Sequence, residues 1–251
     1  MASLEGQVAW ITGAGTGIGR AGALALAEAG ATIVLSGRRL EKLEEVAQAI
    51  GGSAHSLPLD VADAAAVEAT AEEIRQRHGR IDILINSAGI NTPQRFFKNL
   101  TLESWNRVTR VNLDGALYCI HAVLPGMRAQ GGGLVINVAS WAGKDHLYFT
   151  GPAYTASKHA LVALTVSLNM EEGRNGIRAT AICPGEVATP ILKDRPKPPS
   201  DEEIARMLRP EDLGRTIRFV AEMPPHVTLN EILIGPTWNR MYLGGEDLPR
   251  P

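Results

Sequence analysis

Seven short apolar runs alternate with longer segments of helical periodicity along this chain of 251 residues. The apolar runs are residues 7–12, 32–37, 54–59, 81–86, 134–139, 178–183 and 230–234. Most are apolar at consecutive positions, as in strands of a parallel sheet that is covered on both faces. The helical segments between them are residues 17–29, 40–50, 62–78, 102–129, 153–172 and 210–222. The alternation predicts an α/β fold, in which right-handed βαβ units form one doubly wound, seven-stranded parallel sheet with helices on both faces.

The composition limits the partners that the chain can have. Lysine and arginine number 25 against 27 acidic residues, so the formal net charge is −2, and no run of basic residues is present. Nucleic acid and membranes are therefore disfavoured as partners. No apolar run approaches the ~18 residues of a membrane span, and the first residues lack the pattern of a secretion signal. The length and the 45% hydrophobic content suit one domain over residues 1–251, which we expect in the cytoplasm.

Cysteine and histidine positions indicate neither a disulfide nor a metal site. Cys119 and Cys183 stand in apolar surroundings and are expected to be small buried side chains. The six histidines are scattered without the spacing of metal ligands.

A cluster of glycines follows the first apolar run. Gly13, Gly17 and Gly19 precede a helix rich in alanine. Glycines at such a turn let the backbone approach a pyrophosphate, which the helix N-terminus attracts. The spacing differs from the common G-x-G-x-x-G fingerprint, because Ile18 occupies the third glycine position when the pattern is read from Gly13. A simple tight turn remains the alternative, but the position after the first strand favours a dinucleotide site.

The end of the second apolar run indicates which dinucleotide binds. An acidic residue there would hydrogen-bond the ribose 2′-hydroxyl of NAD. This chain has Arg38 and Arg39 instead. Two guanidinium groups suit the 2′-phosphate of NADP. The alternative is that either arginine belongs only to the start of the next helix. The pattern predicts NADP(H) as cofactor, with NAD(H) the less favoured alternative.

Tyr154 and Lys158 stand four residues apart in the predicted helix 153–172, so their side chains share one face. A lysine ammonium close to a phenol stabilises the phenolate and lowers the tyrosine pKa from its usual value of about 10. Such a tyrosine exchanges a proton near neutral pH, as a general acid–base catalyst does. The pair therefore predicts a proton-transfer site.

Two further polar residues belong to this hypothesis. Ser140 ends the fifth apolar run, fourteen residues before Tyr154. A serine there usually caps a helix or lies in a turn, but beside Tyr154 we interpret it as a hydrogen-bond donor to the substrate oxygen. Asn112 lies within the predicted helix 102–129, where asparagine is unfavourable. An exposed asparagine without a role is the alternative.

Taken together, these motifs resemble the short-chain dehydrogenase/reductase family. The motifs in chain order are Thr12–Gly19, Asn86–Gly89, Asn112, Ser140 and Tyr154-x-x-x-Lys158. The resemblance extends from about residue 6 to residue 235, which is nearly the whole chain. It implies a single Rossmann-type domain with a seven-stranded parallel sheet, in agreement with the seven apolar runs.

The resemblance also implies roles for further residues. Asp60 and Val61 would flank the adenine, and Asn86–Gly89 would line the cofactor and brace the sheet. Asn112 would open its helix and hold a water that connects Lys158 to solvent. Residues 184–189 would hold the nicotinamide carboxamide. The expected catalytic residues are Ser140, Tyr154, Lys158 and Asn112, and the expected cofactor-binding residues are Gly13, Thr16, Gly17, Ile18, Gly19, Arg38, Arg39, Asp60, Val61, Asn86, Ala88, Gly89, Tyr154, Lys158, Pro184, Gly185, Val187 and Thr189.

The function expected from these motifs is hydride transfer between NADP(H) and the carbonyl or alcohol carbon of a small molecule. Tyr154 would act as the general acid and base. One alternative is a reductase of 3-oxoacyl groups on an acidic carrier protein, for which Arg128 is a candidate docking residue. Another is a catalytically silent protein that senses NADP, although such a sensor would not need the Ser140, Tyr154 and Lys158 set.

The substrate side is less defined by the sequence. Residues 186–209 are expected to form a lid and residues 236–251 a C-terminal tail. Residues 226–240 resemble in part the subset of the family that acts on small hydroxy acids or serine-like substrates. Arg95 is expected to be solvated, with carboxylate binding as the alternative. The helices 102–129 and 153–172 are apolar around much of their circumference, and related proteins pair them across subunits, so a homotetramer is expected. Candidate substrate contacts are Trp141, His146, Tyr148, Glu186 and Ile191.

Overall fold

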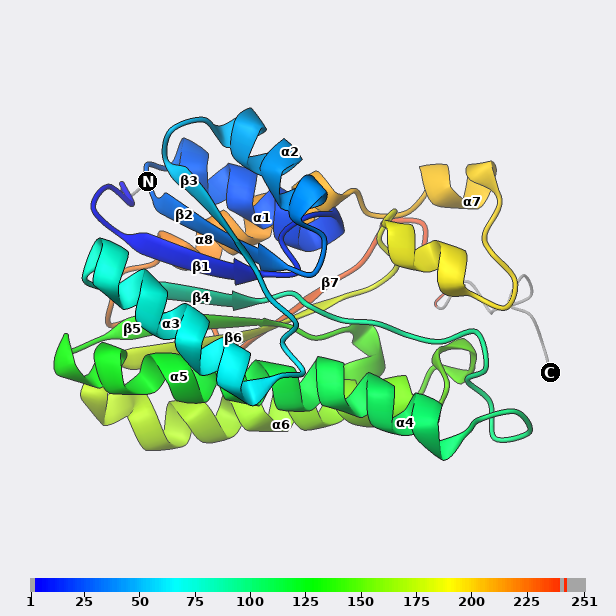
Figure 1. The fold of residues 1–251 in the computed structure, drawn as a ribbon. Helices are drawn as coiled ribbons and strands as arrows, with labels where there is room; N and C mark the ends of the chain where they lie inside the picture. Colours follow the sequence, from blue (N-terminus) through cyan, green and yellow to red (C-terminus); the bar gives the residue numbers. More distant parts are fainter. Residues whose placement is uncertain (1–2, 240–241, 243–251) are drawn as a thin grey trace.

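A doubly wound parallel sheet forms the centre of the computed structural model, which describes residues 3–239 and 242 (Figure 1). The sheet has seven strands in the order β3-β2-β1-β4-β5-β6-β7, and every pairing is parallel. The strands are β1 (Val8–Thr12), β2 (Thr32–Gly37), β3 (Ala54–Pro58), β4 (Ile83–Asn86), β5 (Gly133–Val138), β6 (Ile177–Pro184) and β7 (Glu231–Ile234). The predicted fold class is thereby confirmed, because each of the seven apolar runs forms a strand.

Helices cover both faces of the sheet. One layer holds α1 (Gly17–Glu28), α2 (Leu40–Ile50) and α8 (Pro210–Ala221) (Figure 1). The other layer holds α3 (Ala64–His78), α4 (Leu102–Thr109), α5 (Gly115–Ala129) and α6 (Pro152–Glu172). Side chains of a strand point alternately to the two faces, so Ile11 packs under α1 and α8 while its neighbour Trp10 packs under α3 and α5. The sheet therefore separates two hydrophobic cores.

The predicted helix 102–129 is not continuous. A π-helical turn, Arg110–Asp114, separates α4 from α5. Asn112 lies in this turn, where its side-chain oxygen accepts a hydrogen bond from the Ile90 backbone N–H at 2.8 Å. Its amide nitrogen donates to the Ile90 carbonyl at 3.0 Å and to Ser157 Oγ at 3.2 Å. The opening of the helix that the family resemblance implied at Asn112 is therefore present.

Small differences at element ends have local causes. The third helix begins at Ala64 rather than at residue 62, because the Asp63 carboxylate caps it by accepting hydrogen bonds from the N–H groups of Ala65 and Ala66. Strand β4 begins at Ile83 rather than at residue 81. The preceding Asp82 uses its carboxylate to accept a hydrogen bond from the Val8 N–H at 2.8 Å and to pair with Arg80.

The chain segments that follow the carboxyl ends of β1, β4, β5 and β6 meet at one edge of the sheet, where ligands bind in open α/β folds. The expected lid, residues 186–209, contains a 3₁₀ turn (Pro190–Asp194) and the short helix α7 (Asp201–Ala205). An isolated parallel bridge between Val187 and Leu208 joins its two ends. Most of the expected tail 236–251 lies outside the described residues. Among the helices of the described chain, none is long and apolar enough to cross a membrane.

Candidate active site

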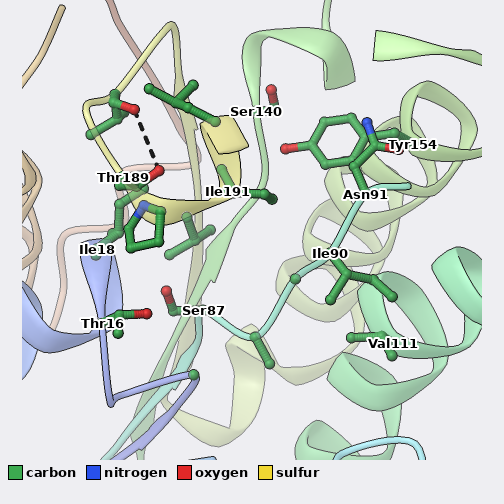
Figure 2. Close-up of a pocket in the computed structure, with 18 of the residues that line it drawn as sticks. Thr16, Ile18, Ser87, Ile90, Asn91, Val111, Ser140, Tyr154, Thr189 and Ile191 are labelled. Carbon is green, nitrogen blue, oxygen red and sulfur yellow. Dashed lines mark hydrogen bonds between the residues drawn. The ribbon is translucent and has the colours of Figure 1, made fainter. Parts of the chain in front are cut away.

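A cavity of about 320 Å³ opens at the carboxyl edge of the sheet. Figure 2 shows Thr16, Ile18 and Ser87 at one end of it and Ser140, Tyr154 and Asn91 at the other. The cavity thus joins the glycine-rich loop to the tyrosine that the sequence singled out. Most expected site residues line it, namely Gly13, Thr16, Gly17, Ile18, Arg38, Arg39, Asp60, Val61, Ala88, Gly89, Ser140, Tyr154, Lys158, Pro184, Gly185, Val187 and Thr189.

The glycine-rich loop is packed so closely at Gly13 and Gly19 that a side chain is excluded at both positions. Gly13 has a φ of +66°, and a Cβ atom there would stand 2.8 Å from the backbone of Ala88. Gly17 has a φ of +56°, which also favours glycine. Gly19 does not line the cavity, but a Cβ on it would stand 2.4 Å from the Gly13 carbonyl oxygen. The loop between β1 and α1 therefore leaves a cradle at the helix N-terminus, as a pyrophosphate requires.

Positive side chains gather where β2 ends. Arg38 and Arg39 are exposed and line the cavity together with Lys42, whose ammonium pairs with Glu45 at 2.6 Å. The sequence interpretation missed Lys42, which stands three residues after Arg39 in the first turn of α2. Asp60, beyond β3, accepts a hydrogen bond from the Ala62 N–H at 3.0 Å. The residues present at this end suit the adenosine half of a dinucleotide that carries an additional phosphate.

Ser140, Tyr154 and Lys158 come together at the other end of the cavity. Ser140 follows β5, and its Oγ accepts a hydrogen bond from the Ala142 N–H at 3.1 Å. Tyr154 lies in the first turn of α6, and Lys158 lies one turn later with its Nζ 5.7 Å from the centre of the tyrosine ring. Lys158 Nζ is buried and donates to the Val138 carbonyl at 2.8 Å. Both hydroxyls can reach one substrate oxygen at this end of the cavity (Figure 2).

The electrostatics of Tyr154 differ from the expectation. Burial raises the pKa of Tyr154, whereas the Ser140 side chain and the charges of Arg195 and Arg95 lower it, and the net direction is upward. Burial also lowers the pKa of Lys158 to about 8. The net direction is therefore opposite to the expectation that Lys158 lowers the pKa of Tyr154, because burial has the largest effect at both groups.

Asn86, Asn112 and Gly19 are expected site residues that do not line the cavity. The Asn86 amide nitrogen donates to Asn137 Oδ1 at 2.9 Å, and Asn137 donates in turn to Thr165 Oγ1 at 2.9 Å. Asn86 therefore braces β4 against β5. Asn112 holds Ile90, whose neighbour Gly89 lies close to Lys158 Nζ. These asparagines act on the site through the backbone that they hold.

Residues after β6 complete the wall. Pro184, Gly185, Val187 and Thr189 all line the cavity, and Thr189 Oγ1 donates weakly to the Val187 carbonyl at 3.4 Å (Figure 2). A Cβ on Gly17 would touch the Thr189 methyl group at 3.1 Å, so this segment packs against the glycine loop.

Two of the five expected substrate contacts do not line the cavity. Trp141, Glu186 and Ile191 line the cavity, but His146 and Tyr148 do not. Their neighbours Leu147 and Phe149 take those positions, while Tyr148 is 53% exposed and stacks on Phe96. His146 stacks on His159 instead.

Arg95 is buried at the wall of the cavity. The expectation of a solvated arginine is wrong, because Arg95 is only 4% exposed and lines the cavity. Arg195, which the sequence interpretation missed, lines the cavity beside it. Arg195 lies in a proline-rich stretch of the lid, and no sequence motif marks it.

Among the described residues, no group of three or more histidine, cysteine, aspartate or glutamate side chains is arranged to hold a metal ion. The fold and the cavity instead define the class of α/β oxidoreductases with a dinucleotide-binding site.

Comparisons with known proteins identify the family. The model of the short chain dehydrogenases matches residues 7–199. An uncharacterized oxidoreductase of Staphylococcus saprophyticus is 38% identical over 245 residues, which cover 94% of this chain and 98% of the relative. The chain belongs to the short-chain dehydrogenase/reductase family and is an oxidoreductase.

Solved structures share the fold. A serine dehydrogenase complexed with NADP⁺ is 29% identical with a TM-score of 0.85, over 93% of this chain and 96% of that one. A 3-ketoacyl-(acyl-carrier-protein) reductase from Brucella melitensis, complexed with NADH, is also 29% identical with a TM-score of 0.85, over 93% and 98% of the two chains. One of these two similar structures thus contains NADP⁺ and the other NADH, and their names refer to different substrates.

Proposed function

We propose that this protein is an NADP(H)-dependent oxidoreductase that interconverts a carbonyl and an alcohol on a small molecule, with Tyr154 as general acid and base. The observation that carries the proposal is the composition of one cavity. One end holds the glycine-rich loop beside Arg38 and Arg39, and the other end holds the Ser140, Tyr154 and Lys158 set. When bound, NADP(H) would supply or accept the hydride.

The chain's own residues handle the proton. In reduction, negative charge develops on the carbonyl oxygen, which therefore needs a proton and hydrogen-bond donors. Tyr154 gives that proton, and the Ser140 hydroxyl donates a hydrogen bond to the same oxygen. Lys158 Nζ, held by the Val138 carbonyl, lies 5.7 Å from the centre of the tyrosine ring. Asn112 fixes the backbone at Ile90 and is proposed to hold a water that connects Lys158 to solvent as a proton relay.

We further propose that residues 1–251 act as one domain in which residues 186–209 cover the substrate. The first part of this segment supports the assignment, since Glu186, Ile191, Leu192 and Arg195 line the cavity. Cytoplasmic location remains our prediction, and two buried free cysteines, Cys119 and Cys183, agree with a reducing compartment.

The cofactor preference gives a direct test. Arg38, Arg39 and Lys42 stand where β2 ends, with no carboxylate at the strand end, so kcat/KM is expected to be higher with NADPH than with NADH. Arg38→Ala should lower kcat/KM for NADPH by about 10- to 30-fold and leave kcat/KM for NADH nearly unchanged. Arg77→Ala, an exposed arginine of α3 far from the cavity, is the matched control. Equal kcat/KM values for the two cofactors in the wild type would contradict the assignment.

The carrier-protein alternative depends on Arg128. Arg128 is paired with the buried Glu172 through Nε at 2.9 Å, and this pairing holds the pKa of Glu172 at about 2. The Arg128 side chain is 49% exposed, so a docking carrier protein would have to compete with Glu172 for its guanidinium. The silent-sensor alternative is tested by NADPH oxidation with a panel of ketones, oxo acids and aldehydes, because tight NADPH binding without turnover of any compound would favour it.

We propose a homotetramer. Apolar side chains on α5 and α6 remain exposed in the single chain, including Leu117 at 43%, Val166 at 40% and Met170 at 82%. Phe219 on α8 and Leu233 on β7 are also exposed, at 53% and 51%. Light scattering is expected to give about four times the mass of the 26.8 kDa chain. A monomer at micromolar concentration would contradict the proposal. The Val166→Glu variant should form smaller species than the wild type, because a charge would replace an apolar side chain of the proposed interface.

A further inference from the structure

Two arginines stand at the substrate end of the cavity, on the side of Ser140 and Tyr154. Arg95 comes from the segment after β4, and Arg195 follows the 3₁₀ turn of the lid. Both are shielded, since Arg95 is 4% exposed and the Arg195 side chain is 15% exposed. Burying a guanidinium group away from water costs free energy unless its charge is paired with an opposite charge or with hydrogen-bond acceptors.

Arg95 joins three separate segments of the cavity wall. Its Nε donates to the Thr92 carbonyl at 2.7 Å, its Nη1 to the Phe149 carbonyl at 3.4 Å and its Nη2 to the Asp194 carbonyl at 2.6 Å. These bonds use neutral acceptors, so they orient the guanidinium without cancelling its charge. The side chain of Asp194 also acts on Arg95 but does not line the cavity. Arg95 is thus a positioning residue that brings Arg195 to the site.

Arg195 has part of its hydrogen-bonding capacity left over. Its Nη1 donates to the Glu186 carboxylate at 2.7 Å, and its guanidinium lies 5.1 Å from the centre of the Phe149 ring. Within the described residues, Nε and Nη2 of Arg195 have no protein acceptor. This edge of a guanidinium is the one that binds a carboxylate through two parallel hydrogen bonds.

The charges at this end do not cancel. Among the described residues at this end, Arg95, Arg195 and Lys158 line the cavity together with the carboxylate of Glu186, and the Asp194 carboxylate acts on Arg95 from outside the cavity lining. The charges that act on the Tyr154 hydroxyl are those of Arg195 and Arg95, and both lower its pKa. This excess of positive charge attracts an anionic substrate but contributes little to the binding of a neutral ketone.

From this geometry we infer that the enzyme takes short oxo acids and hydroxy acids, with Arg195 binding the substrate carboxylate and Arg95 holding Arg195 and the cavity wall in place. The inference rests on the proposed function and narrows its substrate class to carboxylates. The carboxylate would lie between Arg195 and the reacting carbon, which faces Ser140 and Tyr154. Glu186 opposes the substrate charge and orients Arg195 at the same time.

The test compares one acid with its uncharged ester. Acetoacetate and methyl acetoacetate share the reacting ketone, so the ratio of their kcat/KM values cancels any effect of a variant on the shared chemistry. We expect the wild type to favour the acid by at least about 10-fold. Arg195→Gln should lower this ratio by about 10- to 100-fold, chiefly through KM for the acid, and Arg195→Lys should restore part of it. Glu186→Gln should move the ratio in the opposite direction.

A binding measurement keeps the inference testable without turnover. Isothermal titration with 3-hydroxybutyrate and its methyl ester, in the presence of NADPH, to which an alcohol cannot transfer a hydride, should give the tighter complex with the acid in the wild type and not in Arg195→Gln. Equal ratios in the wild type and Arg195→Gln would overturn the inference while leaving the proposed function intact. The inference would also be overturned if Arg195→Gln raised KM for NADPH equally with the acid and with the ester, because Arg195 would then bind the cofactor rather than the substrate. If no carbonyl compound is turned over, the proposed function fails and the titration still decides the carboxylate site.

Discussion

Replacing Tyr154 with phenylalanine should lower kcat for carbonyl reduction by at least about 1000-fold, because the variant has no proton to give to the developing alkoxide. The affinity for NADPH should remain within about threefold of the wild type, since the ring keeps its packing over Lys158 Nζ at 5.7 Å from the ring centre. Steady-state NADPH oxidation measures the first quantity, and NADPH fluorescence titration measures the second.

Tyr148→Phe provides the matched control for this variant. Tyr148 lies six residues before Tyr154 in the chain, is 53% exposed and does not line the cavity. Its loss of a hydroxyl should change kcat by less than about twofold. If Tyr154→Phe retains a tenth of the wild-type kcat, the proton must come from another group and the proposed mechanism is wrong.

The same mechanism sets the pH dependence of the wild type. Alcohol oxidation needs the Tyr154 phenolate, so its rate should rise with pH, whereas reduction needs the phenol and should fall as pH passes the Tyr154 pKa. Burial raises this pKa, and Ser140, Arg195 and Arg95 lower it. Arg195→Gln should therefore move the rising limb of oxidation to higher pH. A limb that stays in place would mean that the Arg195 charge does not reach Tyr154.

The strands and the cavity end proposed for the cofactor could be predicted from the sequence because their signals are local. A strand that is buried on both faces is apolar at consecutive positions, as VAWIT in β1 shows. The glycine loop is a single contiguous motif, and Tyr154 and Lys158 are neighbours on one helix face. Each signal lies within a few residues, so tertiary structure was not needed to read it.

The substrate end could not be predicted, because its residues are assembled from distant segments. The buried Arg95 donates hydrogen bonds to the carbonyls of residues 92, 149 and 194. Two of these residues are far from it in the chain, so no local sequence pattern distinguishes Arg95 from an arginine exposed to solvent. In the segment 146–149, which runs into a 3₁₀ turn at Tyr148–Thr150, Leu147 and Phe149 line the cavity while His146 and Tyr148 do not. The sequence showed the correct segment but not which of its alternate side chains point inward.

The electrostatic prediction failed for a related reason. Helical spacing placed the Lys158 ammonium near the Tyr154 ring, and that placement is correct. The pKa of Tyr154 depends equally on how deeply both groups are buried and on which other charges reach them. Burial lowers the pKa of Lys158 to about 8, and the cations that act on Tyr154 are Arg195 and Arg95. None of these quantities can be obtained from the Tyr-x-x-x-Lys spacing.

The second large effect is expected for Gly19→Ala, a substitution that adds one methyl group outside the cavity. The new Cβ would stand 2.4 Å from the Gly13 carbonyl oxygen and 2.8 Å from the Gly13 carbonyl carbon, so the loop backbone must move. Gly13 has little room to yield, because its own backbone lies against Ala88. The loop that should cradle the pyrophosphate therefore opens, and Kd for NADPH should rise by at least about 100-fold, with a loss of about 1–3 kcal/mol in the free energy of unfolding.

Gly126→Ala separates this effect from the general consequence of replacing a helical glycine. Gly126 lies inside α5, and a Cβ there would have its nearest neighbour, Arg75 Cδ, at 3.8 Å. Alanine is the better helix former, so this variant should be as stable as the wild type or up to about 1 kcal/mol more stable, with unchanged NADPH affinity. Thermal unfolding and NADPH titration of both variants make the comparison. Should Gly19→Ala bind NADPH as tightly as Gly126→Ala, the close contact between Gly19 and Gly13 would not be what shapes the cradle, and the cofactor would have to be held chiefly by Arg38, Arg39 and the wall after β6.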